Sequence, residues 1–437
     1  MIHSIPKTEL NSRQQKILQL LPKNQALLIL SNQVFLRNSD TDYRFRQDSN
    51  FWYFTGFDED KAAILFLDGK IYLFAKEKHD FSETWTGKIT GLDAAKSLVN
   101  ADEVYPFEKL LETIQNKAAK FKKIFFDADG NSFVKLRSQL EDLFVDQQIK
   151  VEPEEYLTSQ LRMYKSTWEI EQMQNAAQIS ILAHQRIAQY LQDYKSNTTR
   201  NPLFNTNSEK NSLSEYQLHA ILDYTFKENA CLEAYPPIVA SGDNATTLHY
   251  WQNNKNFKSN DLILIDAACE HNYYSSDITR VYSLNKFSSA QQEIYDLVLK
   301  TNLEVIEFAK THTHKDLTLQ RLQQLSNQIL SQGLIDLSIL KGSLEHILKK
   351  SLFRSFYMHG ISHWLGLDTH DQGVYKDNNG NPVVLKPGMS FTVEPGLYFK
   401  ADDLNVPEKY RGIGVRIEDD LVLTKDGIIN LTGSLIK

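Results

Sequence analysis

Two aspartates flank a short turn in the run DLILIDAACEHNYYSSDITRVYSL. Apolar residues on both sides of this turn predict two antiparallel strands. If the turn centres between His271 and Asn272, Asp266 faces Asp277 with the Cβ atoms about 4.5–5.5 Å apart. At this distance on a half-buried sheet the two carboxylates repel each other, and a cation between them removes the repulsion. Asp266 ends the apolar run LILI, where an unpaired carboxylate is costly to bury, so a metal site is favoured over one turn aspartate and one solvent-facing aspartate.

Two glutamates lie where apolar residues are expected. Glu394 interrupts the strand-like run FTVEPGLYF, and Glu418 interrupts GVRIEDDLVL. A single glutamate in such a run is usually an edge or interface residue. Four carboxylates in apolar strand context, these two and the aspartate pair, share one explanation, which is metal coordination.

Three histidines lie close together in YMHGISHWLGLDTHD, at positions His359, His363 and His370. The first two have the spacing of a zinc-protease helix motif, but Gly360 replaces the general-base glutamate and disfavours a helix. A chance cluster of core or surface histidines is the alternative, since the chain contains 12. Four carboxylates with one imidazole form a hard, oxygen-rich ligand set. Such a set suits Mn²⁺ or Mg²⁺ best, with Zn²⁺ and Co²⁺ as alternatives.

The elements that position these residues divide the chain in two. Short apolar runs from about residue 24 to 126, with a hairpin turn at Asp68-Gly69, predict an N-terminal α/β domain ending near residue 160. Apolar residues at helical spacing after Ser166 or Thr167, either of which can act as an N-cap, predict a long amphipathic helix.

The rest of the second part mixes helices and strands, so the predicted fold class is α/β (α+β). Residues 195–213 are rich in Ser, Asn and Thr and predict a surface loop. The remaining predicted elements are a helix near 214–228, extended segments at 236–249 and 261–283, two helices within 288–350, and strands at 389–399 and 411–424.

Composition narrows the class of protein. The 437 residues are 41% apolar and 24% charged, as in folded globular proteins of two or three domains. A net charge of −7 without a basic stripe disfavours nucleic acid as a partner. Two cysteines, Cys231 and Cys269, are too few for a disulfide framework and favour a reducing compartment. The N-terminus lacks a signal-peptide core and no apolar run reaches about 18 residues, so a cytoplasmic protein without membrane contact is expected.

The five candidate ligands occur in the contexts IDAAC, SSDITR, HGISHWLG, TVEPG and RIEDD, in the order Asp266, Asp277, His363, Glu394 and Glu418. This set resembles the metal-ligand signature of the aminopeptidase P and prolidase family, which has the pita-bread fold. YRFRQDSNFWYFTGF at 43–57 and the segment Trp85-Thr86-Gly87 resemble the N-terminal domain of aminopeptidase P. The resemblance implies a domain at 1–160 for substrate access and oligomerisation and a dinuclear metallopeptidase domain at 161–437.

The implied activity is metal-dependent release of the N-terminal residue from peptides with proline second, by a hydroxide that bridges two divalent metals. Mn²⁺ is the metal expected in this ligand set, with Zn²⁺, Co²⁺ and Mg²⁺ as alternatives. Asp266 and Asp277 would hold one metal, and Asp277 and Glu418 would bridge. His363 and Glu394 would complete the second, and Glu394 would carry the proton of the nucleophilic water.

The resemblance also implies roles for residues that are not ligands. His249, His359 and His370 would contact the substrate and its oxyanion, with packing against a tryptophan as the alternative for each. Arg416 would brace the metal carboxylates by charge-assisted hydrogen bonds. Tyr398 and Trp85 would bind substrate, with Trp85 reaching the site of a neighbouring subunit, so a homo-oligomer, a dimer or tetramer, is implied.

Two other functions remain open. A prolidase would cleave only Xaa-Pro dipeptides. A non-catalytic peptide-binding protein with the pita-bread fold is disfavoured because all five ligands are present. Bacterial members of the family carry an aspartate where Asn50 stands and an arginine near Asn379, so the resemblance does not extend to recognition of the peptide ends by these charges.

Overall fold

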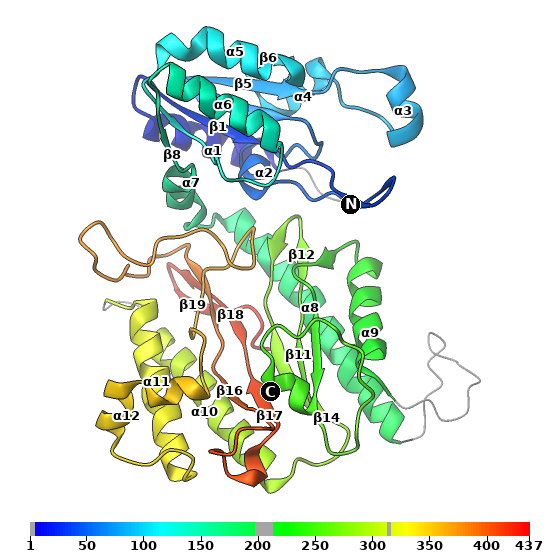
Figure 1. Cartoon of the computed structure of the whole chain (residues 1–437), viewed down its shortest axis with the longest axis vertical. Helices are drawn as coiled ribbons and strands as arrows, with labels where there is room; N and C mark the ends of the chain where they lie inside the picture. Colours follow the sequence, from blue (N-terminus) through cyan, green and yellow to red (C-terminus); the bar gives the residue numbers. More distant parts are fainter. Residues whose placement is uncertain (1–4, 197–212, 313–315) are drawn as a thin grey trace. The chain divides into compact units, whose positions relative to one another are not determined.

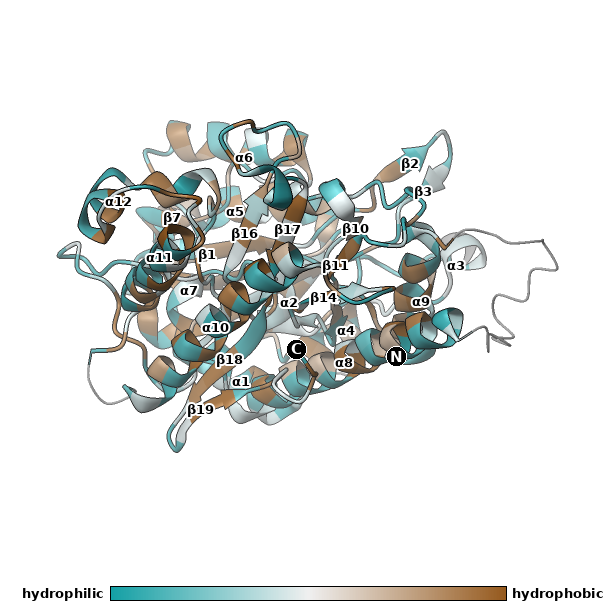
Figure 2. Ribbon diagram, turned by 90° about the horizontal axis from the view of Figure 1, so that it is seen from below, coloured by the Kyte–Doolittle hydropathy of each residue, from teal (hydrophilic) through white to brown (hydrophobic). Residues whose placement is uncertain are grey.

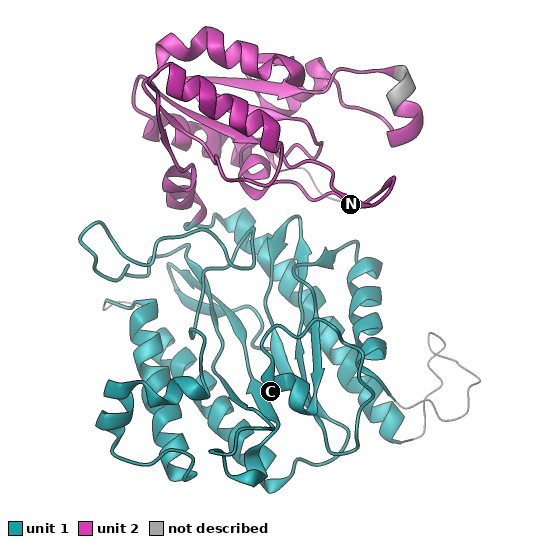
Figure 3. Ribbon diagram, viewed as in Figure 1, with its two compact units in different colours: residues 1, 163–437 teal, residues 2–162 magenta. Residues whose placement is uncertain are grey.

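The computed structural model describes residues 5–196, 213–312 and 316–437. The chain forms two compact units, called here in chain order the first unit (residues 2–162, magenta in Figure 3) and the second unit (residues 163–437, teal). The loop predicted at 195–213 lies almost wholly outside the described residues.

The first unit is built on a six-stranded mixed sheet with the order β6-β5-β4-β1-β7-β8 (Figure 1). Its strands are β1 (Gln25–Leu30), β4 (Ala63–Leu67), β5 (Lys70–Ala75), β6 (Glu103–Pro106), β7 (Lys123–Phe125) and β8 (Lys150–Glu152), with a separate pair β2 (Leu36–Asn38) and β3 (Thr41–Asp42). Its helices are α1 (Lys7–Leu20), α2 (Ser49–Thr55), α3 (Asp80–Thr86), α4 (Leu92–Val99), α5 (Leu110–Lys117), α6 (Val134–Asp146) and α7 (Glu155–Arg162). Asp68 and Gly69 join β4 to β5 with φ of 52° and 74°, the left-handed geometry of a two-residue hairpin turn. The predicted α/β character and this turn are confirmed.

The second unit has its strands in the middle and its helices outside (Figure 1). The helices are α8 (Thr167–Lys195), α9 (Glu215–Glu228), α10 (Ser289–Thr311), α11 (Leu319–Asp336) and α12 (Leu344–Lys350). The strands are β9 (Leu232–Glu233), β10 (Ile238–Ser241), β11 (Leu262–Asp266), β12 (Cys269–His271), β13 (Tyr274–Ser275), β14 (Thr279–Ser283), β15 (Ser390–Val393), β16 (Gly396–Phe399), β17 (Ile413–Arg416), β18 (Asp419–Thr424) and β19 (Gly427–Asn430). Helices α8 and α9 share one core with β10 and β11, and α10 and α11 share two others with β15 to β18. The strands in the middle therefore carry the four candidate carboxylates or lie next to them, and helices pack against these strands from both sides.

The long helix α8 begins as its sequence predicts. Ser166 is its N-cap and forms a capping box, in which the Glu169 backbone N–H donates to Ser166 Oγ at 3.2 Å and the Glu169 carboxylate accepts from the Ser166 N–H at 2.8 Å. Figure 2 shows hydrophilic and hydrophobic residues interspersed along α8, whose buried apolar residues include Met173, Ile181 and Ile187. Between residues 288 and 350 the prediction of two helices is wrong. The described residues of this range form three helices, because Ser343 caps a further helix by accepting from the His346 N–H.

The two cysteines are buried and free, and none of the helices in the described parts of the chain combines the length and the apolarity that a bilayer crossing requires.

A buried histidine predicts how stability changes with pH. His184 on α8 is fully buried, with Nδ1 2.9 Å from the Tyr282 hydroxyl and Nε2 2.9 Å from the Ala267 carbonyl oxygen. Burial lowers its pKa to about 3, while the same side chain in the unfolded chain has a pKa of about 6.5. As pH falls through this window the unfolded state takes up a proton that the folded state refuses, so stability is lost.

We expect the urea-unfolding free energy of the wild type to fall as pH drops from 6.5 toward 3 more steeply than that of His184→Gln, which has no imidazole to protonate. The exposed His346, replaced in the same way, is the control and should keep the wild-type dependence. Equal pH dependence in wild type and His184→Gln would contradict this role of burial.

Candidate metal centre

The two aspartates converge, but not by the register expected from the sequence. Asp266 ends β11 and faces Thr279, two residues beyond Asp277. The turn centres between Asn272 and Tyr273, whose φ values of 49° and 65° allow a two-residue turn there, so the predicted facing of Asp266 and Asp277 is wrong. Because the shift is two residues and side chains alternate with a period of two, both carboxylates stay on one face of the sheet.

The two glutamates lie opposite each other at a break in a hairpin. Val393 of β15 faces Asp419 of β18, and Gly396 of β16 faces Arg416 of β17. The same register on both sides places Glu394 opposite Glu418, between the paired segments. The continuous strands predicted at 389–399 and 411–424 are therefore each divided, because Pro395 has no N–H with which to continue the ladder.

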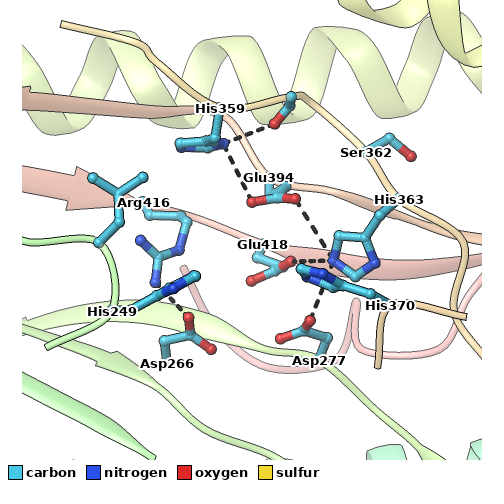
Figure 4. Close-up of a pocket in the computed structure, with 12 residues that line it drawn as sticks. His249, Asp266, Asp277, His359, Ser362, His363, His370, Glu394, Arg416 and Glu418 are labelled. Carbon is cyan, nitrogen blue, oxygen red and sulfur yellow. Dashed lines mark hydrogen bonds and ion pairs between the residues drawn. The ribbon is translucent and has the colours of Figure 1, made fainter. Parts of the chain in front are cut away.

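The histidine segment has no helical structure and lies beside the end of strand β15 and Glu394, whose N–H donates to the Ile361 carbonyl oxygen at 2.9 Å; its histidines are drawn in Figure 4. His363 Nε2 lies 3.4 Å from Asp277 Oδ2, 3.7 Å from Glu394 Oε1 and 4.0 Å from Glu418 Oε1. Its other ring nitrogen, Nδ1, is 3.0 Å from the Trp364 carbonyl oxygen and can donate its proton there. That hydrogen bond leaves the Nε2 lone pair for a cation; metal-binding histidines commonly donate their other ring N–H to a carbonyl oxygen in this way.

The pKa values of the clustered carboxyl groups indicate a site that favours bound cations. Burial raises the pKa of Asp266, raises that of Glu394 to about 7, and raises that of Glu418 well above its usual value. Burial lowers the pKa of His363, but its hydrogen bond to Asp277 and the neighbouring carboxylates raise it to about 9 overall. Ionised carboxylates in this space need more positive charge than one guanidinium supplies.

The site is a cavity of about 220 Å³ within the second unit (Figure 4). It is lined by Leu248, His249, Asp266, Asp277, His359, Gly360, Ser362, His363, His370, Glu394, Arg416 and Glu418. Nine predicted site residues are therefore brought together here, with Arg416 the one lysine or arginine among the described lining residues. Ligand atoms of Asp277, His363 and Glu418 lie within 4.8 Å of one another, an arrangement that can hold a metal ion.

The remaining predicted contacts surround these ligands. His359 Nδ1 is 3.4 Å from Glu394 Oε2, its Nε2 is 2.8 Å from the Tyr398 hydroxyl, and burial lowers its pKa to about 3. The His370 ring centroid is 4.2 Å from that of His363. The Arg416 guanidinium hydrogen-bonds the Asp266 carboxylate and donates to the Tyr398 hydroxyl at 2.9 Å. Tyr398 thus lies behind the cavity wall rather than among its lining residues.

Two residues named from the sequence lie in the first unit. Trp85, on α3, is 78% exposed. Asn50 is buried, donates to Glu154 Oε1 at 2.7 Å and accepts from Arg162 Nη1 at 2.8 Å.

Sequence reasoning missed two residues of the centre. The Tyr235 hydroxyl lies 2.7 Å from Asp266 Oδ1 and 2.6 Å from Asp277 Oδ1, so it joins the aspartate pair. Thr279 donates to Glu418 Oε2 at 2.7 Å and accepts from Arg416 Nε at 3.0 Å. A lone tyrosine before two prolines carries no signal, whereas Thr279 could have been inferred from its place two residues after Asp277 on one face of a strand.

Comparison with known proteins decides the family. The model of metallopeptidase family M24 matches residues 171–425, and the model of the aminopeptidase P N-terminal domain matches residues 10–125. The chain belongs to metallopeptidase family M24. The Xaa-Pro aminopeptidases of Haemophilus influenzae and Escherichia coli are 36% and 34% identical to this M24 peptidase, each over 99% of the chain and 96% of the relative.

Solved structures agree with this membership. Pseudomonas aeruginosa aminopeptidase PepP superposes on this M24 peptidase with a TM-score of 0.87 and 32% identity, covering 100% of this chain and 97% of the other. Escherichia coli aminopeptidase P with the inhibitor Pro-Leu gives a TM-score of 0.85, with the same identity and the same coverage. The predicted fold, an N-terminal aminopeptidase P domain followed by a pita-bread catalytic domain, is confirmed, and so is the prediction of a metal-binding hydrolase.

Proposed function

We propose that this M24 peptidase releases the N-terminal residue from peptides that have proline in the second position. The observation that carries this proposal is the convergence of three carboxylates, those of Asp277, Glu394 and Glu418, on His363 Nε2 in a cavity that Asp266 and three further histidines also line. The relatives from Haemophilus influenzae and Escherichia coli, each matched over 96% of its length, are named Xaa-Pro aminopeptidases.

We assign the metal ligands as Asp266, Asp277, His363, Glu394 and Glu418, and propose two divalent ions, with Mn²⁺ best suited to this oxygen-rich set. A structure of the Escherichia coli relative is described as zinc-substituted, so a site of this kind accepts more than one metal. Two such ions would supply a water of lowered pKa and would polarise the scissile carbonyl.

Glu394 is proposed to carry the proton between the attacking water and the leaving nitrogen. Its carboxylate lies 3.7 Å from His363 Nε2 and 3.4 Å from His359 Nδ1, a position from which it can take up the proton of a water in the site and return it. His359 Nδ1 faces Glu394 Oε2, while the Tyr398 hydroxyl holds the other ring nitrogen. The Gly360 carbonyl oxygen, 2.7 Å from Nδ1, also holds the ring, so His359 is fixed beside the Glu394 carboxylate.

The neighbouring groups are proposed to bind the substrate. His249 and His370 line the cavity and can donate hydrogen bonds to the tetrahedral oxyanion or to the carbonyl beyond proline, and such bonds are strengthened where water is excluded. Burial lowers the pKa of His370, which keeps its ring neutral. Arg416 holds the Asp266 carboxylate and so fixes one ligand.

A bond before proline has its own requirement. It is a tertiary amide without N–H, so a peptidase that recognises that hydrogen loses its contact.

In our proposal the first unit, residues 1–160 with Trp85, shapes substrate access and forms the contacts of a dimer or tetramer. The two free, buried thiols fit a reducing compartment such as the cytoplasm.

Hydrolysis of three peptides by the Mn²⁺-loaded protein tests this function. We expect release of alanine from Ala-Pro-Ala, and at least about 10-fold lower kcat/KM on Ala-Ala-Ala, because one well-fitted apolar contact discriminates by about 10–200-fold. Cleavage of the dipeptide Ala-Pro alone would instead identify a prolidase. Bound Mn²⁺ without turnover of any of the three would support the non-catalytic alternative.

A further inference from the structure

The break that presents Glu394 and Glu418 is closed from behind by one buried side chain. Asn302 lies on α10, which packs along β15, β16 and β17, and it is fully buried. Its amide nitrogen donates to the carbonyl oxygen of Val393 at 3.2 Å and to that of Ile417 at 3.3 Å. Each of these carbonyls belongs to the residue directly before one of the two glutamates.

One of the two carbonyls has no partner from the hairpin itself. The Ile417 N–H donates to the Pro395 carbonyl oxygen at 3.3 Å, but the reciprocal bond cannot form because Pro395 has no N–H. The amides of both glutamates also turn away from the hairpin, toward the carbonyl oxygens of Ile361 and Thr279. A buried carbonyl without a donor is costly, and Asn302 supplies the missing hydrogen.

The orientation of the amide is fixed by a cation. Lys437 Nζ donates to Asn302 Oδ1 at 2.6 Å and also pairs with Asp419 Oδ2 at 2.6 Å. Asp419 directly follows Glu418, and its other oxygen pairs with Arg280 Nη2 at 3.0 Å. With its oxygen toward the ammonium group, Asn302 presents both amide hydrogens to the break, so that both of its donors are used.

We propose that Asn302 is a positioning residue for the metal centre: its amide clamps the two strand breaks that present Glu394 and Glu418, and Lys437 holds that amide in register. This inference rests on the proposed function for its catalytic consequence. The physical step is independent of substrate, since a carboxylate ligand can hold a cation only if its backbone is held at the required position.

The test measures Mn²⁺ affinity by calorimetry on metal-free protein, together with kcat and KM on Ala-Pro-Ala. For Asn302→Leu, which keeps the volume but removes both donors, we expect about 10–100-fold weaker Mn²⁺ binding and a fall in kcat with KM nearly unchanged. The matched control is Thr301→Val, on the same helix and fully buried, whose hydroxyl bonds only the Leu297 carbonyl oxygen among the contacts of the described residues. It should bind Mn²⁺ like wild type, even if its stability falls.

A second pair of variants keeps the inference testable if Asn302→Leu does not fold. Lys437 lies nearer the surface, with 13% of its side chain exposed. Lys437→Met is expected to weaken Mn²⁺ binding in the same direction, and Lys437→Arg, which keeps a donor cation, to restore it. Wild-type Mn²⁺ affinity in Asn302→Leu, or in Lys437→Met when the former is unfolded, would overturn the clamp. Failure of the wild type to cleave Ala-Pro-Ala would overturn the proposed function instead, and would leave the affinity comparison standing.

Discussion

Replacement of Glu394 by alanine is expected to lower kcat on Ala-Pro-Ala by about 10²–10⁴-fold, the range that a positioned proton-transfer group contributes. Glu394 is 3.7 Å from His363 Nε2 through one carboxylate oxygen and 3.4 Å from His359 Nδ1 through the other. The alanine variant loses both contacts, one to His363 and one to His359. Steady-state kinetics with saturating Mn²⁺, and bound metal measured on the same sample, would check this result.

Glu394→Gln separates the two roles of this residue. The amide keeps an oxygen for a cation but cannot carry a proton at neutral pH, so we expect metal content close to wild type and turnover close to that of the alanine variant. Glu307→Ala, on the exposed face of α10, is the matched control and should keep wild-type kcat. Wild-type turnover by Glu394→Ala would refute the assignment of Glu394.

Removal of divalent metal is expected to abolish hydrolysis and also to destabilise the fold. Four carboxylates share the cavity with a single guanidinium, so without cations some of them must take up protons or repel each other. Metal that binds the folded state stabilises it by about 2.7 kcal/mol at a concentration 100 times its Kd. Chelation followed by dialysis should lower the unfolding midpoint, and Mn²⁺ should restore both the midpoint and the activity.

The loss of stability in the metal-free protein should depend on pH. Burial raises the pKa of Glu394 from 4.5 to about 7. A carboxyl whose pKa is raised in the folded state contributes stability below its unfolded pKa and loses it as pH rises through the folded value. The unfolding midpoints of metal-free and Mn²⁺-loaded protein should therefore move apart between pH 4.5 and 7. A constant difference across this window, or full activity after chelation, would show that the cluster does not hold the catalytic metal.

The aspartate pair shows how far local patterning reaches. Apolar flanks place Asp266 and Asp277 on a two-stranded hairpin, and the alternation of side chains places them on the same face in any register that differs by two residues. The exact register was wrong, because the turn depends on which residues adopt positive φ, and Asn272 and Tyr273 adopt it here. Both carboxylates still lie on one face, because a shift of two residues does not change the face on which a side chain lies.

The glutamate pair shows what a linear pattern leaves out. The apolar runs around Glu394 and Glu418 read as continuous strands, although both strands break at the glutamates. The sequence contains Pro395 but does not say which strand pairs with it. A proline interrupts a strand only where the neighbouring strand requires its missing N–H as a hydrogen-bond donor. The proposed contribution of Trp85 to a neighbouring subunit stays a prediction.

By itself, the sequence of this M24 peptidase determined which residue types could bind metal, and its motifs were sufficient to indicate the family and the two-domain fold. Tertiary structure alone decided that His363 Nε2 points at three carboxylates, that Tyr235 joins Asp266 to Asp277, and that Asn302 closes the break behind the glutamates. The reason is physical. Each of these contacts joins segments far apart in the chain, and their meeting depends on how sheets and helices pack, which no local period encodes.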